Sequence, residues 1–173
     1  MTAALQIAEY EARVLAGEDL SVDDGLLLLQ ELGPADPEAL LAAADRIRRH
    51  FVGDEVHLCS IINAKSGRCS EDCGFCAQSA RFDTGVDEYG LIDQATARQA
   101  ARRARENGAE ALGLVAAWRG LSDGPELERV LELVREASDE GRVHVDASLG
   151  LIDDPKVAQA LADAGLHTYN HNL

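Results

Sequence analysis

The sequence predicts an α/β fold: about four parallel strands forming part of a TIM-type (β/α) barrel, preceded by an N-terminal helical cap. Residues 1–50 show helical periodicity only, whereas from residue 51 onward short apolar runs alternate with amphipathic helical segments. Repeated strand–helix units are typical of a parallel sheet with right-handed crossovers. A complete eight-stranded barrel takes about 250 residues, so the chain has room for roughly half of one. We therefore expect a cap over 1–50 and the N-terminal half of a barrel over 51–173.

The cap is predicted to contain three helical segments. The first covers residues 3–15, and Ser21 is placed to cap a second that runs to a stop at Gly33-Pro34. Pro37 then occupies the first position of a third helix. Helical spacing predicts that one face of this third helix is buried. That face consists of Leu40, Leu41, Ala44, Ile47 and Phe51.

The barrel portion begins with an apolar run over residues 56–63 that predicts a buried strand. A long loop over 64–90 follows, and loops of this length inside a domain usually have a function. Two later helices have apolar faces predicted to pack inward: Leu127, Val130, Leu131, Val134 and Ala137 in one, and Val157, Ala158 and Leu161 in the other. The remaining strands are expected at 111–117, 143–148 and 167–172, with helices over 93–107, 125–141 and 155–165.

The charge balance excludes several classes of partner. The chain has 31 acidic and 16 basic residues, a net charge of −15. Nucleic acids and anionic membrane surfaces both require a positive face, so neither is expected as a partner. Two interpretations of the acidity remain open: an ordinary solvated acidic surface, or adaptation to high salt.

The sequence also indicates a compartment. It contains no apolar run long enough to span a membrane and no secretion signal at its N-terminus. Three of the four cysteines lie in one loop, a spacing unlike that of a disulfide framework. A reducing cytoplasm, in which thiolates stay available for metal, fits this pattern best.

The loop cysteines are the strongest candidates for a functional site. Cys69, Cys73 and Cys76 follow a C-x3-C-x2-C spacing. Thiolates select zinc, Cu(I) or iron–sulfur clusters, and closed zinc sites and ferredoxin-type clusters use four protein ligands. Three thiolates on a four-iron cluster would leave one iron open to a ligand that is not protein. A zinc clip, or thiols without a ligand, are the alternatives.

Other polar residues fall where the predicted strands end, which is where barrel enzymes carry their reactive groups. Arg119 and Ser148 follow the second and third strands, and Asn170 and Asn172 lie at the end of the fourth. Because a single residue separates the two asparagines, both of their side chains point to the same face of the strand. Their amides offer donors and an acceptor without charge, which suits a ribose hydroxyl or a ureido ring; a role in a turn is the alternative.

The cysteine loop, with the aromatic Phe75 just before its last cysteine, resembles the signature of the radical S-adenosylmethionine (SAM) enzymes. Its flanks, residues 56–67 and 77–82, are similar to those of the biotin synthases. Three later segments of residues 37–173 share the resemblance: Ala116-Ala117-Trp118-Arg119, Ser148-Leu149-Gly150 and Tyr169-Asn170-His171-Asn172-Leu173. The resemblance implies the N-terminal portion of such an enzyme.

The resemblance also implies cofactors and contacts. The three loop cysteines would hold a 4Fe–4S cluster, whose open iron binds the amino and carboxylate groups of SAM. SAM would contact Phe75 through its adenine, Ala116, Ala117 and Trp118 through its methionine part, and Asn172 through its adenosyl group. Asn170 would bind the ureido ring of the substrate, dethiobiotin. No side chain is assigned as a catalytic residue.

The implied activity is insertion of sulfur into dethiobiotin to form biotin, started by a 5′-deoxyadenosyl radical. An electron donor such as flavodoxin or ferredoxin is expected, and the resemblance allows for a homodimer. The chain would be truncated and inactive on its own. A related radical SAM enzyme with another small-molecule substrate, and a non-catalytic iron–sulfur module in which Cys59 is a fourth ligand, are the alternatives.

One departure concerns the sulfur donor. Biotin synthases carry a second, 2Fe–2S cluster on strand cysteines, but the matching positions here are Gly113 and either Asp146 or Ala147. A different auxiliary cluster, a partner that brings sulfur, or an altered reaction would each account for this. Cys59 is expected to be either a buried strand cysteine or a ligand of another auxiliary cluster. The histidines near strands, His57, His144 and His167, are predicted to pack or hydrogen-bond.

Overall fold

The computed structural model describes residues 2–171, apart from the side chains of residues 140 and 141. The chain forms two compact units, residues 1–56 and 57–173. The division expected after residue 50 lies near the end of the last helix of the first unit. Within the described residues, no helix combines the length and apolar character needed to cross a membrane.

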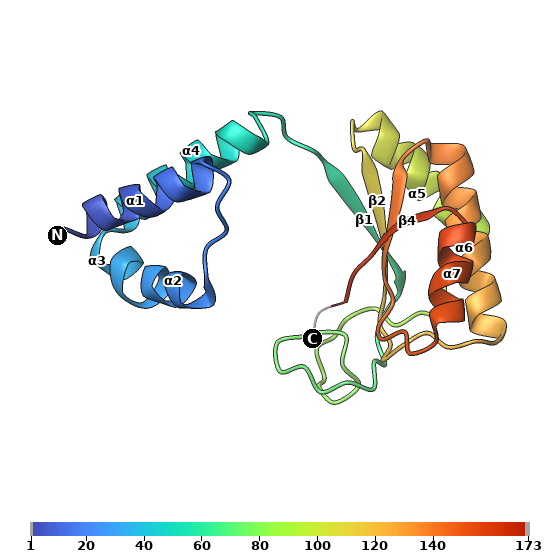
Figure 1. Ribbon diagram of the computed structural model, residues 1–173. Helices are drawn as coiled ribbons and strands as arrows, with labels where there is room; N and C mark the ends of the chain where they lie inside the picture. Colours follow the sequence, from blue (N-terminus) through green and yellow to red (C-terminus); the bar gives the residue numbers. More distant parts are fainter. Residues whose placement is uncertain (1, 172–173) are drawn as a thin grey trace. The chain divides into compact units, whose positions relative to one another are not determined.

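The first unit is helical (Figure 1). Its elements are α1 (Ala3–Leu15), α2 (Val22–Leu27), the π-helix η1 (Leu28–Leu32), α3 (Gly33–Ala35) and α4 (Pro37–Phe51). Ser21 caps α2 in a reciprocal pair of hydrogen bonds. Its Oγ accepts from the Asp24 N–H at 3.1 Å, and Asp24 Oδ2 accepts from the Ser21 N–H at 2.9 Å.

The predicted stop at Gly33-Pro34 is wrong, because the chain stays helical through Ala35. The π-turn explains the continuation: the Gly33 N–H donates to the carbonyl of Leu28, one residue further back than in an α-helix. Pro34, which has no N–H, then lies in the first turn of α3, where none is required. A Cβ on Gly33 would lie 2.7 Å from that Leu28 oxygen, so the close approach requires glycine.

The buried face of α4 also differs from the predicted one. Ala43 is buried with Ile7 and Leu32, and Leu40 packs against them. Leu41, Ala44 and Phe51 are exposed. α1 packs along α4, and this tertiary contact selects a strip of the helix rotated from the one that hydropathy favours.

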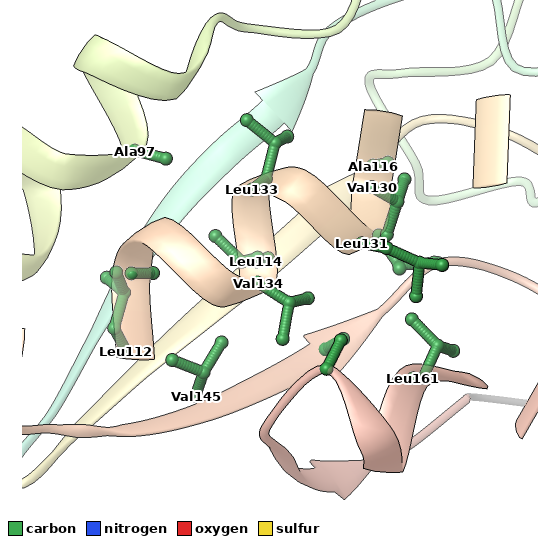
Figure 2. Packing of buried hydrophobic residues seen from close by; sticks show 14 of the residues in the cluster. Ala97, Leu112, Leu114, Ala116, Val130, Leu131, Leu133, Val134, Val145 and Leu161 are labelled. Atoms are coloured by element: carbon green, nitrogen blue, oxygen red, sulfur yellow. The ribbon is translucent and has the colours of Figure 1, made fainter. Parts of the chain in front are cut away.

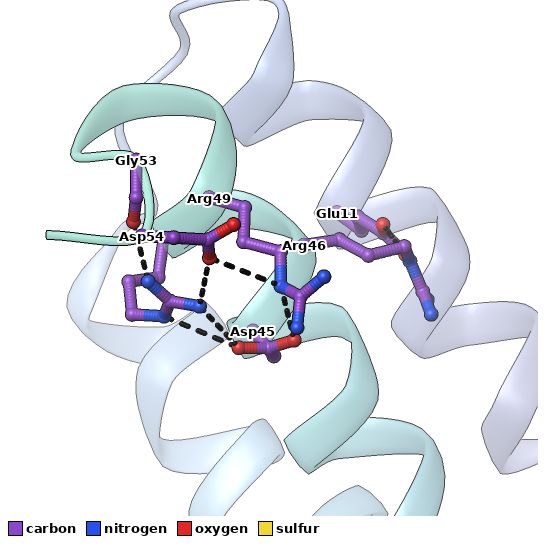
Figure 3. A network of polar contacts seen from close by, with 7 residues as sticks. Glu11, Asp45, Arg46, Arg49, Gly53 and Asp54 are labelled. Carbon is purple, nitrogen blue, oxygen red and sulfur yellow. Dashed lines mark hydrogen bonds and ion pairs between the residues drawn. The ribbon is translucent and has the colours of Figure 1, made fainter.

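Arginines and carboxylates join the C-terminal half of α4 to α1 and to the residues that follow α4 through exposed ion pairs (Figure 3). Arg46 forms a bidentate pair with Glu11 of α1, at 2.5 and 2.7 Å, and this hydrogen bonding holds the pKa of Glu11 below its usual value. Asp45 accepts from Arg48 at 2.8 Å and pairs with Arg49 at 2.9 Å. These contacts hold α4 against α1 and shape its C-terminal end.

The second unit is a parallel four-stranded sheet in the order β1-β2-β3-β4. Figure 1 shows its three helices together on one face of the sheet. This arrangement confirms the predicted α/β class and the partial barrel. The strands are β1 (Cys59–Lys65), β2 (Ala111–Ala116), β3 (His144–Ser148) and β4 (Leu166–Tyr169), and the helices are α5 (Gln94–Glu106), α6 (Pro125–Gly141) and α7 (Pro155–Asp163).

Alternate residues of the inner strands pack against the helices, as Figure 2 shows. Leu112 and Leu114 of β2 and Val145 of β3 meet Val134 of α6 and Leu161 of α7 in one buried cluster. The predicted inward face of α6 is confirmed, since all five of its residues are buried. In α7 the prediction holds for Val157 and Leu161 but is wrong for Ala158, which is exposed.

The prediction of a buried first strand is wrong. β1 begins at Cys59, and Val56 and Leu58 are exposed residues that precede it. Ile61, in the middle of the strand, is 70% exposed. β1 lies at the edge of the described sheet and turns Ile61 to the face opposite the helices, so its apolar composition does not imply burial on both sides.

Candidate metal centre

Parallel pairing brings the ends of all four strands to one edge of the sheet, where the cysteine loop begins. Backbone contacts join these ends further. Leu121 N–H donates to Leu151 O at 3.0 Å, and Leu151 N–H donates to Arg119 O at 2.9 Å. The phenol of Tyr169 donates to Gly150 O at 2.6 Å, and burial raises the pKa of this phenol, so it remains a donor at neutral pH. Hydrogen bonds therefore connect the loops that follow β2 and β3 and the end of β4, and we call this connected edge of the sheet the platform.

The cysteine loop is fixed to this platform at its base. Ser66 and Tyr89 exchange two backbone hydrogen bonds, each of 3.1 Å, which closes the loop near its ends. Closer to the thiols, the Cys69 N–H donates to Gln78 O at 3.0 Å and the Ala80 N–H donates to Cys69 O at 2.8 Å. The first cysteine is thus held by the segment that follows the last one.

The three thiols share this loop but differ in exposure. Cys69 and Cys76 are half-buried, Cys73 is exposed, and none of them forms a disulfide. The Cys76 N–H donates to Cys73 O at 3.0 Å, which fixes a turn between the last two cysteines. The chemistry of the donor set fits a cluster, because three unoxidised thiols project from one anchored loop.

Among residues 2–171, no group of three or more His, Cys, Asp or Glu side chains is arranged to hold a single metal ion. The stretch from Asp72 to Phe75, which includes the second cysteine, is exposed.

Side chains from the strand ends connect the loop to β2. Lys65 Nζ donates to Ala117 O at 2.6 Å and to Gly67 O at 3.1 Å. Arg119 pairs with Glu71, between the first two cysteines, at 3.5 Å. The Trp118 indole N–H donates to Leu149 O at 2.5 Å, which links the loops after β2 and β3.

The residues expected to contact SAM and substrate lie in varied surroundings. Phe75 is 94% exposed, so its ring is available to a ligand. Ala116 and Ala117 are buried, and their carbonyls already accept from Trp118 N–H and from Lys65. The Asn170 backbone N–H donates to Ala147 O, and its side chain is exposed. Asn172 lies outside the described residues.

The sheet does not offer the strand thiolates of a second cluster. Gly113 pairs in register with Ile61 on one side and Asp146 on the other. Ala147 is buried in the core under the helices, so Asp146 is the residue that faces away from them. Neither Gly113 nor Asp146 supplies a thiolate, so the residues present do not fit a 2Fe–2S cluster bound by cysteines of β2 and β3.

Cys59 lies far from the cysteine loop. It is the first residue of β1, whereas the loop leaves the last, Lys65. Six steps of an extended strand span roughly 20 Å, so Cys59 is not positioned as a fourth ligand of the loop site. The expectation of a buried strand cysteine is wrong, because Cys59 is exposed at the edge of the sheet.

The histidines near the strands contact other side chains. His57 Nδ1 lies 2.5 Å from Glu110 Oε2. The rings of His144 and His167 are 4.3 Å apart, and His167 Nδ1 lies 2.9 Å from Thr168 Oγ1. These contacts confirm the prediction of packing and hydrogen-bonding histidines.

Three polar residues of the site were not predicted: Lys65, Gln78 and Ser79. The last two lie two and three residues after the final cysteine and belong to the flank on which the resemblance was based. One signal was available for Lys65, since it is one of only two lysines in an acidic chain. Burial of Ser79 could not be read from a polar loop sequence.

The family of the chain follows from its similarity in sequence to known proteins. Residues 64–173, which include the cysteine loop and strands β2 to β4, match the family model described as Radical SAM superfamily. The chain is 48% identical over 164 residues to the biotin synthase of Natronomonas pharaonis, covering 93% of this chain and 43% of that protein. It is 44% identical over 169 residues to the biotin synthase of Geotalea daltonii, covering 98% of this chain and 51% of that protein. The chain spans about half the length of the curated relatives it matches. By the family match over most of its length, the chain belongs to the radical SAM superfamily.

Proposed function

We propose that this chain supplies the cluster- and SAM-binding portion of a biotin synthase, the enzyme that inserts sulfur into dethiobiotin. One observation carries the proposal. A single loop at the carboxyl edge of a parallel sheet presents three thiols, and the fourth cysteine lies at the opposite end of β1. Identity of 48% to a biotin synthase supports the choice of substrate.

In this proposal Cys69, Cys73 and Cys76 hold a 4Fe–4S cluster, and the chain consists of a helical cap over 1–50 and a barrel portion over 51–173. When bound, such a cluster would supply the electron that cleaves the sulfonium of SAM, and that chemistry would belong to the cofactors. The chain's own task is to bind and orient. Lys65 and Arg119 fix the loop against the end of β2 through the contacts given above.

The proposed contacts of SAM follow from what each position offers. The exposed ring of Phe75 covers the adenine, and the end of β2 from Ala116 to Trp118 lies beside the methionine part. Asn172 binds the adenosyl group. The exposed amide of Asn170 binds the ureido ring, because its oxygen and nitrogen match the ring's N–H donors and carbonyl acceptor.

The surroundings of the reaction complete the proposal. An electron donor such as flavodoxin or ferredoxin reduces the cluster, and the protein works in the reducing cytoplasm, where the thiols stay free. A homodimer is the proposed assembly. Sulfur comes from a source other than a cluster on β2 and β3, since Gly113 and Asp146 occupy those strands.

A second candidate function is radical SAM chemistry on another small molecule. It is favoured by the pairing of Gly113 with Asp146 on the face of the sheet away from the helices. A carboxylate there would suit a cationic substrate group. The two candidates therefore differ in whether dethiobiotin is converted.

A chimeric protein distinguishes the two candidate functions. Residues 1–173 are joined to the unmatched remainder of the Natronomonas pharaonis biotin synthase, and iron and sulfide are added under anaerobic conditions. We expect biotin from dethiobiotin, loss of biotin in the Cys73→Ala chimera, and none from the 173-residue chain alone. A chimera that binds the cluster and cleaves SAM but transfers no deuterium from labelled dethiobiotin to 5′-deoxyadenosine would contradict the substrate assignment, whatever the sulfur source.

A further inference from the structure

Ser79 is one of two polar residues that the described chain buries, with 5% of its surface exposed. Its Oγ donates to the main-chain oxygen of Glu71 at 2.6 Å and accepts from the Arg81 N–H at 3.2 Å. Glu71 lies between Cys69 and Cys73. One hydroxyl therefore connects the stretch between the first two cysteines to the segment that follows the third.

Gln78 extends this connection towards the start of the loop. Its Oε1 accepts from the Gly67 N–H at 2.6 Å and from Ser66 Oγ at 3.1 Å. Its main-chain oxygen accepts from the Cys69 N–H at 3.0 Å. Together the two residues hold both sides of Cys69, while Cys73 and its neighbours remain exposed.

The contrast between a fixed Cys69 and an exposed Cys73 affects how the loop binds a cluster. Gathering three thiolates around a cluster costs conformational entropy for every loop residue that must be ordered. Contacts that already fix the loop before binding reduce this cost, and residues behind metal ligands commonly change metal affinity by about 10- to 100-fold. Ser79 and Ser66 are the buried members of these contacts, and the hydroxyl of Ser79 is thus shielded from competing water.

We propose that Ser79 is a positioning residue for the cluster: its hydroxyl holds the Glu71 carbonyl and thereby the stretch of chain that carries Cys69 and Cys73. The inference rests on the proposed function, because it requires that the loop cysteines bind a cluster. It assigns the Gln78-Ser79 pair a task separate from ligation, which is to set the loop before the cluster arrives.

The test compares Ser79→Ala with Ser70→Ala, a matched control at an exposed serine in the same loop. After reconstitution with iron and sulfide, loss of iron to a chelator should be about tenfold faster in Ser79→Ala and unchanged in Ser70→Ala. The electron paramagnetic resonance spectrum of the reduced cluster should change only in Ser79→Ala. Equal rates and identical spectra in the two variants would overturn the proposal.

A second pair of variants separates the effect of the hydroxyl group from the effect of side-chain shape. Threonine and valine have nearly the same shape, so Ser79→Thr should retain iron as the wild type does and Ser79→Val should lose it as Ser79→Ala does. This pair also decides the matter if Ser79→Ala fails to fold. Equal iron loss from the threonine and valine variants would show that the hydroxyl is not the cause and would overturn the proposal.

A third readout is independent of iron. In the iron-free protein, the amide of Arg81 reports directly on its bond to Ser79 Oγ, and its hydrogen exchange should be faster in Ser79→Val than in Ser79→Thr. If the wild type binds no cluster, the proposed function fails, and this exchange still tests whether Ser79 orders the loop. Unchanged exchange would overturn that role as well.

Discussion

Lys65 Nζ lies 2.6 Å from the main-chain oxygen of Ala117, so one ammonium group ties the end of β1 to the end of β2. The same group donates to Gly67 O at the start of the cysteine loop, at 3.1 Å. Hydrogen bonds from a charged donor contribute more than neutral ones, about 1.5–3 kcal/mol each. The carboxyl edge of the sheet therefore depends on a side chain that is not itself a ligand.

Lys65→Met should lower the free energy of unfolding of residues 57–173 by about 3 kcal/mol or more, because two carbonyls lose their charged donor. Chemical denaturation measures the loss. Lys156→Met is the control, since it replaces the other lysine, which is exposed at the start of α7. Equal effects of the two substitutions would mean that the Lys65 contacts contribute nothing specific.

Gly150 and Gly113 should respond in opposite ways to alanine. At Gly150, φ is +80° and a Cβ would lie 2.4 Å from Arg119 O, so Gly150→Ala combines a clash with a strained backbone. The backbone term alone costs about 1–2 kcal/mol. At Gly113, a Cβ would meet Ile61 at an ordinary 3.5 Å, so Gly113→Ala should leave the thermal midpoint unchanged or raise it slightly. A tolerated Gly150→Ala would show that the loops after β2 and β3 are not tightly joined.

Asp24 should contribute stability that depends on acidity. Hydrogen bonds from the backbone and hydroxyl of Ser21 lower the pKa of Asp24 to about 2 in the folded chain. Because the folded pKa lies below the unfolded value of about 3.9, the contribution is fully present above that value and disappears as pH falls towards 2. Carboxyl titration by nuclear magnetic resonance measures the midpoint, and Ser21→Ala should move it upward. A wild-type midpoint near 4 would contradict the capping pair.

The net charge of −15 predicts that salt stabilises the protein. Raising sodium chloride from 0.1 to 1 M shortens the screening length from about 10 to 3 Å and weakens repulsion among the carboxylates. The thermal midpoint should therefore rise over this range. A fall would mean that local ion pairs, such as Arg98 with Glu136 at 2.7 Å, outweigh the general repulsion.

Features set by neighbouring residues in the chain could be predicted from the sequence. The caps Ser21 and Asp93 and the helix-opening Pro125 all act within one turn, and each begins a helix as expected. The cysteine spacing is equally local. The parallel order of the strands could be predicted because the strand–helix pattern repeats along the chain.

Features that depend on distant residues could not be predicted in this way. The π-turn at Gly33 depends on the Leu28 carbonyl, and the buried strip of α4 depends on where α1 lies. Ile61 has an apolar side chain of the kind found in cores, but it is exposed because β1 lies at the edge of the sheet. Ser79 is the converse case, a polar loop residue that becomes buried through its contact with Glu71.

Electron paramagnetic resonance of the reduced, reconstituted protein, recorded with and without SAM, reports whether the cluster has an open iron. We predict a 4Fe–4S signal that SAM alters, that disappears when Cys73 is changed to Ala, and that survives Cys59→Ala. A signal that SAM leaves unchanged, or that requires Cys59 as much as Cys73, would mean four protein ligands and no open iron, and would contradict the proposal.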